Sequence, residues 1–358
     1  MKKSIIIIAL IALMMHDHSI ECMKALKRKQ EDIAAEQLST AQREKRKKRK
    51  SAKPKVDLKK GSEGNEYYGA AWDQGLRSTM EDAHDTNVAK EYAFFGLYDG
   101  HGGRDVADFA ANNLQKHCGV GIDCKSGTWL QKMDESIKKA FKAVDDELDE
   151  QEFDSQRQGC TTVIAIAKCG YLFVAHAGDA RAVRFTVGED PFYTNTMDHK
   201  PNKDERERIE KAGGKIKGGR VWNKDGTYGL AVARSLGDKS LRPYVISEPD
   251  LMLAKGLGAE DVLLILACDG VWDVIGSEDA VKIVLGIENL KIDFENFALG
   301  KSKEIDEKIN AFKNGQIDLE EAAERLRDRA LQKGSSDNVS VIVVNLQRMR
   351  ELYPAPKV

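Results

Sequence analysis

The sequence predicts an α+β fold in which two packed antiparallel sheets are covered by helices. The first observation is a set of apolar, strand-like runs separated by tight turns such as residues 168–170, a spacing typical of antiparallel hairpins. These runs lie at 67–72, 93–98, 161–167, 171–177, 181–185, 262–267 and 339–344. The second observation is that amphipathic helical stretches lie between the runs, so helices are available to cover the outer faces of the sheets.

Two of the helical stretches are long. Residues 128–148 open with a capping box, Thr128-x-x-Gln131, and repeat apolar side chains on one face. Residues 318–332 open with Asp318-x-x-Glu321 and end before Gly334. We expect both apolar stripes to pack in the core. A shorter stripe follows residue 105, and the charged segment 286–317 is predicted to be a variable excursion from the domain.

Length and charge divide the chain into unequal parts. With 358 residues, of which 41% are hydrophobic, the chain can bury a sizeable core, which we assign to 61–350, with a tail at 351–358. Residues 24–60 hold fifteen Lys and Arg against five Asp and Glu, so the total charge of -2 leaves -12 on residues 61–358. An acidic domain of this kind favours divalent cations over nucleic acid as ligands.

The N-terminal segments suggest targeting and tethering. Residues 1–22 have a charged start and eleven apolar residues at 5–15, which resembles a secretory signal and is too short to span a bilayer comfortably. This leader favours a secreted or membrane-associated protein, with a cytoplasmic or nuclear location as the alternative. Residues 23–60 are predicted to be a basic, disordered arm. The arm is a solvated linker or contacts an anionic membrane or nucleic acid.

The six cysteines are expected to be reduced. Cys118 and Cys124 are close enough in sequence to form a disulfide, but the chain has no CxxC pair, and we favour thiols. Three further cysteines lie in apolar runs, where a thiol packs as a small hydrophobe: Cys160, Cys169 and Cys268. His176 and Trp222 are likewise interpreted as structural.

One stretch combines several chemically active groups at the end of a strand. The run 93–98 leads directly into Asp99, Gly100 and His101, and a helical pattern begins a few residues later. Glycine lets backbone approach a ligand closely, and a strand-to-helix turn can aim side chains at one point. Asp-Gly is also a common turn dipeptide, so this stretch alone does not decide the function.

Other acidic residues lie at the ends of other apolar runs. Glu81 and Asp82 follow the first run, Asp269 ends the run 262–267, and Asp337 precedes the last run. A carboxylate inside a sheet is costly unless it is paired, whereas carboxylates collected at strand ends can share a cation. The pattern therefore predicts a divalent-cation site.

Six segments in this order resemble the metal-dependent serine/threonine protein phosphatases of type 2C. They are RSTMEDAH (77–84), LYDGHGG (97–103), AGDARAV (177–183), LAVARSLGD (230–238), LACDGVWDV (266–274) and SSDNVSVIVV (335–344). The resemblance covers roughly 67–346, and residues 198–214 resemble the family's helix and flap region. It implies a four-layer αββα sandwich that binds two Mg²⁺ or Mn²⁺ ions and acts on phosphorylated proteins; we expect a monomer.

The resemblance also implies roles for individual residues in metal binding. Asp99 would bridge both ions, the Gly100 carbonyl would bind one, and Asp269 and Asp337 would bind the other. Asp179 resembles the residue that supports a weaker third metal site in some members of the family.

The remaining site residues would act on water and substrate. Glu81 and Asp82 would hold waters on the metals, Arg77 would bind the substrate phosphate, and His101 would be the general acid. A pair of hard cations suits carboxylates and a backbone carbonyl, and an arginine presents a planar fork to phosphate oxygens.

Two alternatives compete with this function. Another class of metallophosphoesterase would need motifs, such as GDxHG or DxD, that the chain lacks. A catalytically silent scaffold with the same fold, docked through its basic arm, is the second alternative. No predicted ligand is missing, and the two departures from the family pattern, Cys160 and Ala233, look like packing positions, which argues against a silent scaffold.

Overall fold

The computed structural model describes residues 59–188, 193–288 and 303–356. The predicted leader (1–22), the predicted arm apart from its last two residues, and residues 289–302 of the predicted excursion lie outside this part of the chain. Among the described residues, we find no helix of the length and apolar character that a membrane span requires.

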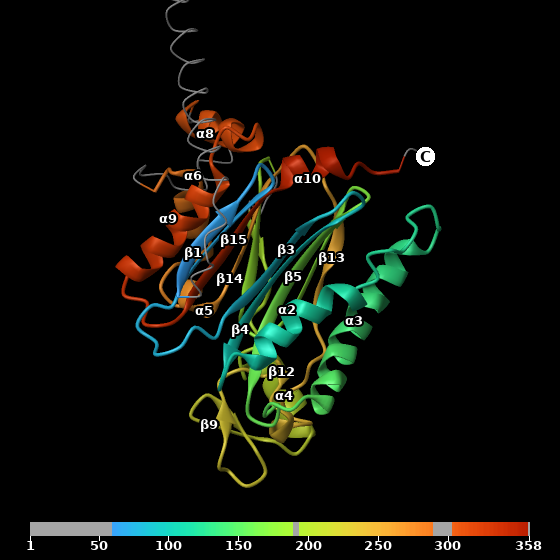
Figure 1. Ribbon diagram of the computed structural model, residues 1–358, viewed down its shortest axis with the longest axis vertical. Helices are drawn as coiled ribbons and strands as arrows, with labels where there is room; N and C mark the ends of the chain where they lie inside the picture. The colour runs from blue at the N-terminus through green and yellow to red at the C-terminus, as the bar shows by residue number, and fades with distance from the viewer. Residues whose placement is uncertain (1–58, 189–192, 289–302, 357–358) are drawn as a thin grey trace, which may run out of the picture. The chain divides into compact units, whose positions relative to one another are not determined.

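Two antiparallel sheets form the centre of the domain, as predicted (Figure 1). The first has the order β1 (Lys60–Gly64), β2 (Tyr68–Asp73), β15 (Val339–Asn345), β14 (Asp261–Ala267), β7 (Arg181–Thr186) and β8 (Tyr193–Asn195). The second has the order β13 (Asp250–Gly256), β6 (Tyr171–Ala177), β5 (Gly159–Lys168), β4 (Ala93–His101) and β3 (Ala83–Val88), with β12 (Leu236–Gly237) also paired to β5.

The side chains of each strand alternate between the core that separates the two sheets and the core under the helices. In β4, Phe95 and Leu97 belong to the core between the sheets, whereas Phe94 and Tyr98 face the core under the helices on the outer side. In β14, Leu264 belongs to the inner core and Ile265 to the outer one. Because successive strand residues point to opposite faces, strands that are apolar throughout can be covered on both sides.

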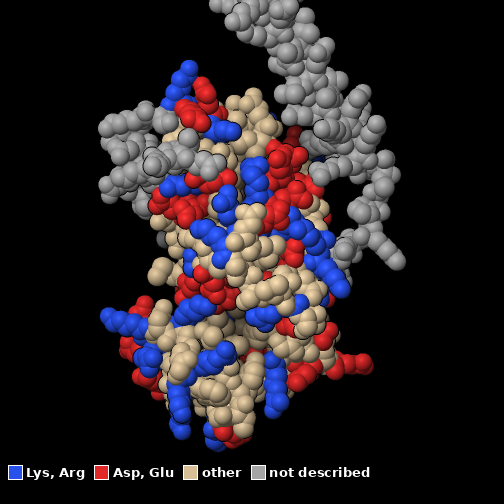
Figure 2. Space-filling model, turned by 90° about the vertical axis from the view of Figure 1, so that its left-hand side faces the viewer, with Lys and Arg blue, Asp and Glu red and all other residues tan. Residues whose placement is uncertain are grey.

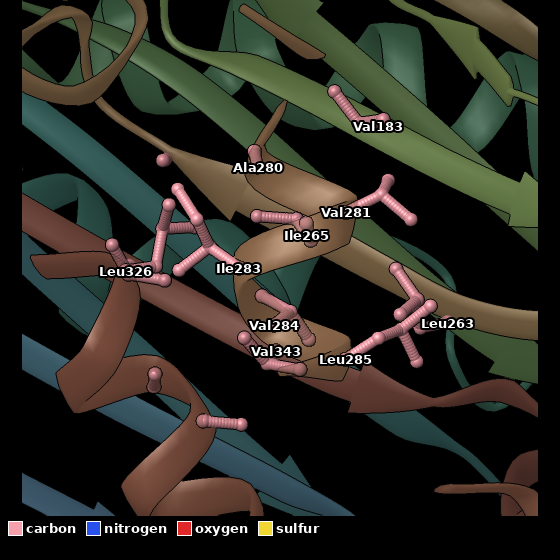
Figure 3. Packing of buried hydrophobic residues seen from close by; sticks show 14 of the residues in the cluster. Val183, Leu263, Ile265, Ala280, Val281, Ile283, Val284, Leu285, Leu326 and Val343 are labelled. Atoms are coloured by element: carbon pink, nitrogen blue, oxygen red, sulfur yellow. The ribbon is translucent and has the colours of Figure 1, made fainter. Parts of the chain in front are cut away.

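Helices cover both outer faces and complete the αββα sandwich. The second sheet is covered by α2 (Asp105–His117) and α3 (Trp129–Glu147), and the first by α5 (Asp269–Trp272), α6 (Ser277–Leu285), α8 (Lys303–Lys313) and α9 (Leu319–Gln332). Figure 3 shows α6 side chains lying over Leu263, Ile265 and Val343 of the sheet. Burying each such aliphatic side chain contributes about 1.5–3 kcal/mol.

The two predicted helix starts differ in their capping. The Asp318 side chain accepts hydrogen bonds from the backbone N–H groups of Glu320 and Glu321, so the N-cap of α9 is confirmed. Thr128 lies at the N-cap of α3 but its side chain makes no capping bond, so the capping-box prediction was wrong there. Instead, its hydroxyl lies 3.3 Å from that of Ser126.

The ends of the folded part extend beyond the predicted strands. β1 begins at Lys60, inside the segment predicted as arm, and pairs with β2. At the other end, α10 (Leu346–Leu352) runs into the predicted tail. Tyr353 is buried, and its hydroxyl donates to the carbonyl of Ala89 or of Tyr92. Neither feature was visible in the sequence. The β1 segment is polar and lacks an apolar strand pattern, and Tyr353 is held by hydrogen bonds to residues far away in the chain.

The cysteine prediction was wrong for one pair. Cys124 and Cys169 form a disulfide between residues 45 positions apart, whereas Cys118, the partner considered from the sequence, is a free buried thiol. Cys160 and Cys268 are also free and buried, as expected. The disulfide joins the loop before α3 to the β5–β6 turn.

A small sheet lies at one end of the domain and is called the flap here. It consists of β9 (Lys215–Lys217), β10 (Arg220–Trp222) and β11 (Gly229–Leu230), and it follows α4 (Lys203–Lys211). In Figure 2, several Lys and Arg side chains project from the lower end of the domain, where Figure 1 places the flap. Trp222 donates to the carbonyl of Lys217 within this sheet, which supports its structural interpretation.

Candidate active site

Most residues predicted for the site line one pocket. Asp82 is the exception, because it is buried behind the pocket wall. The predicted residues that line the pocket are Arg77, Glu81, Asp99, Gly100, His101, Asp179, Asp269 and Asp337. Residues separated by as much as 260 positions in the chain therefore meet in one place.

Both sheets contribute carboxylates to the pocket. Asp99 lies near the end of β4 in the second sheet, and Asp269 opens α5 directly after β14 in the first. Asp337 lies two residues before β15, and Asp179 lies in the turn between β6 and β7. A Cβ at Gly100 would collide with the carbonyl of Glu81, so this position requires glycine.

Three of the carboxylates are crowded together. Oxygens of Asp99, Asp179 and Asp269 lie within 4.8 Å of one another. Burial, together with the charge of Asp269, holds the pKa of Asp99 well above its ordinary value. Burial and the charge of Asp179 raise the pKa of Asp269 to about 7. The protein has thus brought together negative charges that repel one another, and a cation would relieve this repulsion.

Asp82 supports the site from behind. Its Oδ2 accepts a hydrogen bond of 2.6 Å from the Ser340 hydroxyl on β15, which ties the start of β3 to the other sheet. Burial raises the pKa of Asp82 to about 6, against the lowering effect of the Ser340 bond. Arg104 donates to the backbone carbonyls of Met80 and Asp82, so the backbone that carries Glu81 and Asp82 is held in place.

Arg77 and Asp337 form an ion pair at the pocket. Arg77 Nη2 lies 2.5 Å from Asp337 Oδ2, and both side chains are partly exposed. The neighbouring Asn338 donates to the carbonyls of Gln74 and Thr79, and its Oδ1 accepts from the Glu81 backbone N–H. Asn338 therefore fixes the loop that carries Arg77 and Glu81, a role that sequence reasoning missed.

Lys200 is a second residue that sequence reasoning missed. Its ammonium group pairs with Asp179 Oδ2 inside the pocket. Burial disfavours the charged lysine, but the charge and the hydrogen bond of Asp179, together with the charges of neighbouring acids, outweigh burial and raise the pKa of Lys200. Lys200 belongs to the 198–214 segment that resembles the family's helix and flap region, and this resemblance was the available signal.

His101 contacts an acid that was not predicted as a site residue. Its Nε2 lies 2.8 Å from Oδ2 of Asp238, a carboxylate with no exposed surface. Burial opposes the charged imidazole, but the charge of Asp238 and its hydrogen bond outweigh burial and raise the pKa of His101. Asp238 ends the LAVARSLGD segment, so its motif was visible but its contact with His101 was not.

A second group of potential ligands lies outside this pocket and does not form a metal site. His176 and His199 stack with ring centroids 4.3 Å apart and planes inclined by 7°, near Asp250. A metal lies in the plane of the imidazole that binds it, and two nearly parallel, separated planes do not meet at such an ion. In addition, His199 Nδ1 accepts from the Gly178 N–H, so its Nε2 carries the proton and donates to Asp250.

The donor set of the pocket fits a hard divalent cation. Asp99, Gly100, Asp269 and Asp337 line one pocket and offer carboxylate and backbone carbonyl oxygens, without thiolate or a second imidazole among the lining residues. Mg²⁺ and similar ions take oxygen ligands and keep several waters, which suits a pocket open to solvent.

Comparisons with known proteins point to one family. The family model described as "Protein phosphatase 2C" matches residues 68–339. "Protein phosphatase 2C 56" of Arabidopsis thaliana is 36% identical over 276 residues, which are 74% of this chain and 60% of that protein. "Probable protein phosphatase 2C 59" of Oryza sativa subsp. japonica is 34% identical over 297 residues, covering 80% of this chain and 78% of that protein.

A solved structure shows the same fold. The "serine-threonine phosphatase 2C from Toxoplasma gondii" superposes with a TM-score of 0.56 at 22% identity, covering 79% of this chain and 96% of that one. The chain spans 60% of the length of "Protein phosphatase 2C 56" and 61% of the length of "Protein phosphatase 2C 77", both of Arabidopsis thaliana. The match across 68–339 and the identity to these relatives show that the chain belongs to the protein phosphatase 2C family.

Proposed function

We propose that the protein hydrolyses phosphoserine and phosphothreonine in protein substrates with the help of Mg²⁺ or Mn²⁺. The observation that carries this proposal is the crowding of Asp99, Asp179 and Asp269 within 4.8 Å in a pocket that also contains Arg77 and His101. Carboxylates for cations, a guanidinium for phosphate and an imidazole for proton transfer are the groups that phosphate-ester hydrolysis needs.

The acidic residues divide into ion ligands and supporting groups. Asp99, Gly100, Asp269 and Asp337 would hold two divalent cations, and Asp179 a weaker third. When bound, such a pair of ions activates a water molecule and offsets the charge of the phosphoryl oxygens. Glu81 would accept hydrogen bonds from waters in the pocket. Asp82 is buried and does not line the pocket, so it would act on the waters of the site indirectly.

Arg77 and His101 act on the substrate in this proposal. Arg77 is 57% exposed at its side chain, so its guanidinium is accessible to a phosphate monoester. His101 lines the same pocket and would donate a proton to the serine or threonine oxygen as the P–O bond breaks. A protein nucleophile is not needed in this scheme.

The proposal is tested with the purified full chain and a phosphothreonine peptide. We expect phosphate release with Mn²⁺ or Mg²⁺ and its loss with a chelator. Asp99→Asn and Asp269→Asn should each remove most turnover while the protein stays folded by circular dichroism. Asp204→Asn, a change of the same kind at an exposed residue of α4, is the matched control and should keep wild-type turnover.

The catalytically silent scaffold gives the opposite result. A folded wild-type protein that binds phosphopeptide but releases no phosphate with either ion would support the scaffold and contradict the proposed activity. Turnover that persists in Asp99→Asn would contradict the assignment of the ion ligands.

A further inference from the structure

Asp238 occupies an unusual position for a carboxylate. Its side chain has no exposed surface, and its backbone is left-handed, with φ 48° and ψ 39°. Non-glycine residues adopt this conformation at a cost of about 1 kcal/mol or more, and such residues gather at functional sites. Among the residues that the structure describes, neither lysine nor arginine pairs with this carboxylate, and His101 is its one basic partner.

The hydrogen bonds around Asp238 define the state of the His101 ring. The carboxylate accepts from Ser235 Oγ at 2.6 Å and from Tyr228 OH at 2.9 Å, and it lies 2.8 Å from His101 Nε2. An ionised carboxylate only accepts hydrogen bonds, so Nε2 carries the proton in this contact. The other ring nitrogen, Nδ1, has no hydrogen-bond partner in the described contacts.

Glycines on two neighbouring segments make room for this contact. Gly159 on β5 pairs with His101 on β4, and a Cβ at Gly159 would collide with the Asp238 carboxylate. Gly237, the residue before Asp238, has φ 78° and packs against the Gln158 carbonyl. The backbone of three separate segments is therefore shaped to bring the histidine and the buried acid together.

Tyr228 joins this pair to the flap. Its ring packs in the small flap core with Ile209, Val221 and Leu241, while its hydroxyl lies between Asp238 Oδ1 and the carbonyl of Arg157. Burial, followed by the charge of Asp238, raises the pKa of Tyr228, so the hydroxyl remains a donor. A shift of the flap would move this hydroxyl relative to the carboxylate.

We propose that Asp238 and Tyr228 are positioning residues that hold His101 with Nε2 on the buried carboxylate and Nδ1 free for proton donation, so that the flap sets the orientation of the general acid. The proposal rests on the proposed phosphatase function and adds two residues to it. It gives the LAVARSLGD segment and the flap a direct connection to the chemistry.

The proton balance of the step is simple. As the oxygen of a water molecule bonds to phosphorus, the P–O bond to the serine or threonine breaks. The electron pair of the broken bond passes to the serine or threonine oxygen, and this oxygen takes the proton from Nδ1 of the imidazolium. His101 is left neutral, with its remaining proton on Nε2 and still bonded to Asp238. Solvent then returns a proton to Nδ1.

The test compares two substrates in the full chain with Mn²⁺. A phosphothreonine peptide needs protonation of its leaving oxygen, whereas an aryl phosphate such as p-nitrophenyl phosphate releases a stable phenolate. For Tyr228→Phe we expect kcat to fall about 10-fold with the peptide and less than 2-fold with the aryl phosphate, a part of the effect of a general acid. Asp238→Asn should show the same split with a larger loss. Tyr244→Phe, in the same flap cluster, is the matched control and should leave both rates unchanged.

The outcomes separate this proposal from the proposed function. If wild-type protein hydrolyses both substrates but Tyr228→Phe slows both equally or neither, the positioning role is overturned while the phosphatase function stands. If wild-type protein hydrolyses neither, the function itself fails.

The position of the proton on the His101 ring can also be measured by NMR, which requires no turnover and begins with the wild-type protein. In ¹⁵N-histidine-labelled wild-type protein with Mg²⁺, neutral His101 should carry its proton on Nε2. In Tyr228→Phe this tautomer should persist with shifted resonances, and in Asp238→Asn the preference should be lost. A wild-type spectrum with the proton on Nδ1 of neutral His101 would overturn the proposal.

Discussion

Arg77 Nη2 lies 2.5 Å from Asp337 Oδ2, so the group proposed to bind phosphate is paired with a group proposed to bind a cation. The two residues are 260 positions apart, and Asn338, next to Asp337, holds the loop that carries Arg77. A cation on Asp337 would compete with the arginine for the same oxygen. Loading of the cation site would thereby release Arg77 to bind substrate.

Replacing Arg77 tests this relationship. We expect Arg77→Ala to raise KM for a phosphothreonine peptide about 10- to 100-fold, since a charge-assisted hydrogen bond contributes roughly 1.5–3 kcal/mol. Arg77→Lys should recover only part of the loss because an ammonium group lacks the planar fork. Steady-state kinetics with Arg206→Ala, an exposed arginine of α4 paired with Glu210, provide the control. An unchanged KM in Arg77→Ala would contradict the role.

Asp99 should limit the stability of the cation-free protein. Burial and the neighbouring charge of Asp269 raise the pKa of Asp99, so ionisation at neutral pH opposes folding when no cation is bound. In EDTA at pH 7, Asp99→Asn should therefore raise the free energy of unfolding by about 1 kcal/mol, or Tm by roughly 2–4 °C. Thermal melts with and without Mn²⁺ measure this. Stabilisation by Mn²⁺ should be smaller in the variant; a variant that melts earlier than wild type in EDTA would refute the crowding argument.

The stacked pair His176 and His199 should make the fold sensitive to acid. Burial, followed by the charge of His199, lowers the pKa of His176 to about 3, from an ordinary value of 6.5. Below pH 6.5 the unfolded chain binds a proton at His176 that the folded chain does not bind. The contribution of neutral His176 to the free energy of unfolding is therefore fully present above pH 6.5 and is lost as the pH falls toward 3. One such group contributes a slope of up to about 1.4 kcal/mol per pH unit.

His176→Phe removes this titration and keeps an aromatic ring against His199. Urea unfolding between pH 4 and 7 should show a shallower decline in the variant than in wild type. The charged neighbours Asp250 and Arg234 are the same in both proteins, so their effects cancel in the comparison. Parallel curves for His176→Phe and wild type would disprove the contribution of His176.

The disulfide between Cys124 and Cys169 should stabilise the domain. It closes a loop of 45 residues, and its removal should lower the free energy of unfolding by about 2–4 kcal/mol. We expect dithiothreitol and the Cys124→Ala/Cys169→Ala double variant to lower Tm by similar amounts. Dithiothreitol should have no further effect on the double variant, and non-reducing peptide mapping should recover the linked pair from wild type. A Tm that is independent of reductant would show that the bond adds no stability.

The long apolar strands of the fold were predictable from sequence, and the polar strands were not. The runs that became β5, β14 and β15 are buried along their whole length, so their composition alone identified them. β1 and β3 are largely polar and partly exposed, so they form through pairing with neighbours rather than from a local apolar pattern.

The same distinction holds for the site: residues within a local sequence pattern were predictable, and contacts between distant residues were not. A local pattern marks four of the pocket residues, because they stand beside glycines or near the ends of apolar strands: Asp99, Asp179, Asp269 and Asp337. Asp238 also follows a glycine and ends the segment 230–238, but no local pattern shows its contact with His101, 137 residues away. The Cys124–Cys169 bond is hidden for the same reason, since pairing depends on which loops the fold brings together.

The most direct test of the central claim is the rate of phosphate release from a phosphothreonine peptide as a function of free Mn²⁺. The proposed function predicts no release in EDTA, a rate that rises to saturation with Mn²⁺, and little release at any Mn²⁺ concentration in Asp99→Asn or Asp269→Asn. A rate in wild-type protein that does not depend on Mn²⁺ or Mg²⁺, or equal rates in these variants and wild type, would contradict it.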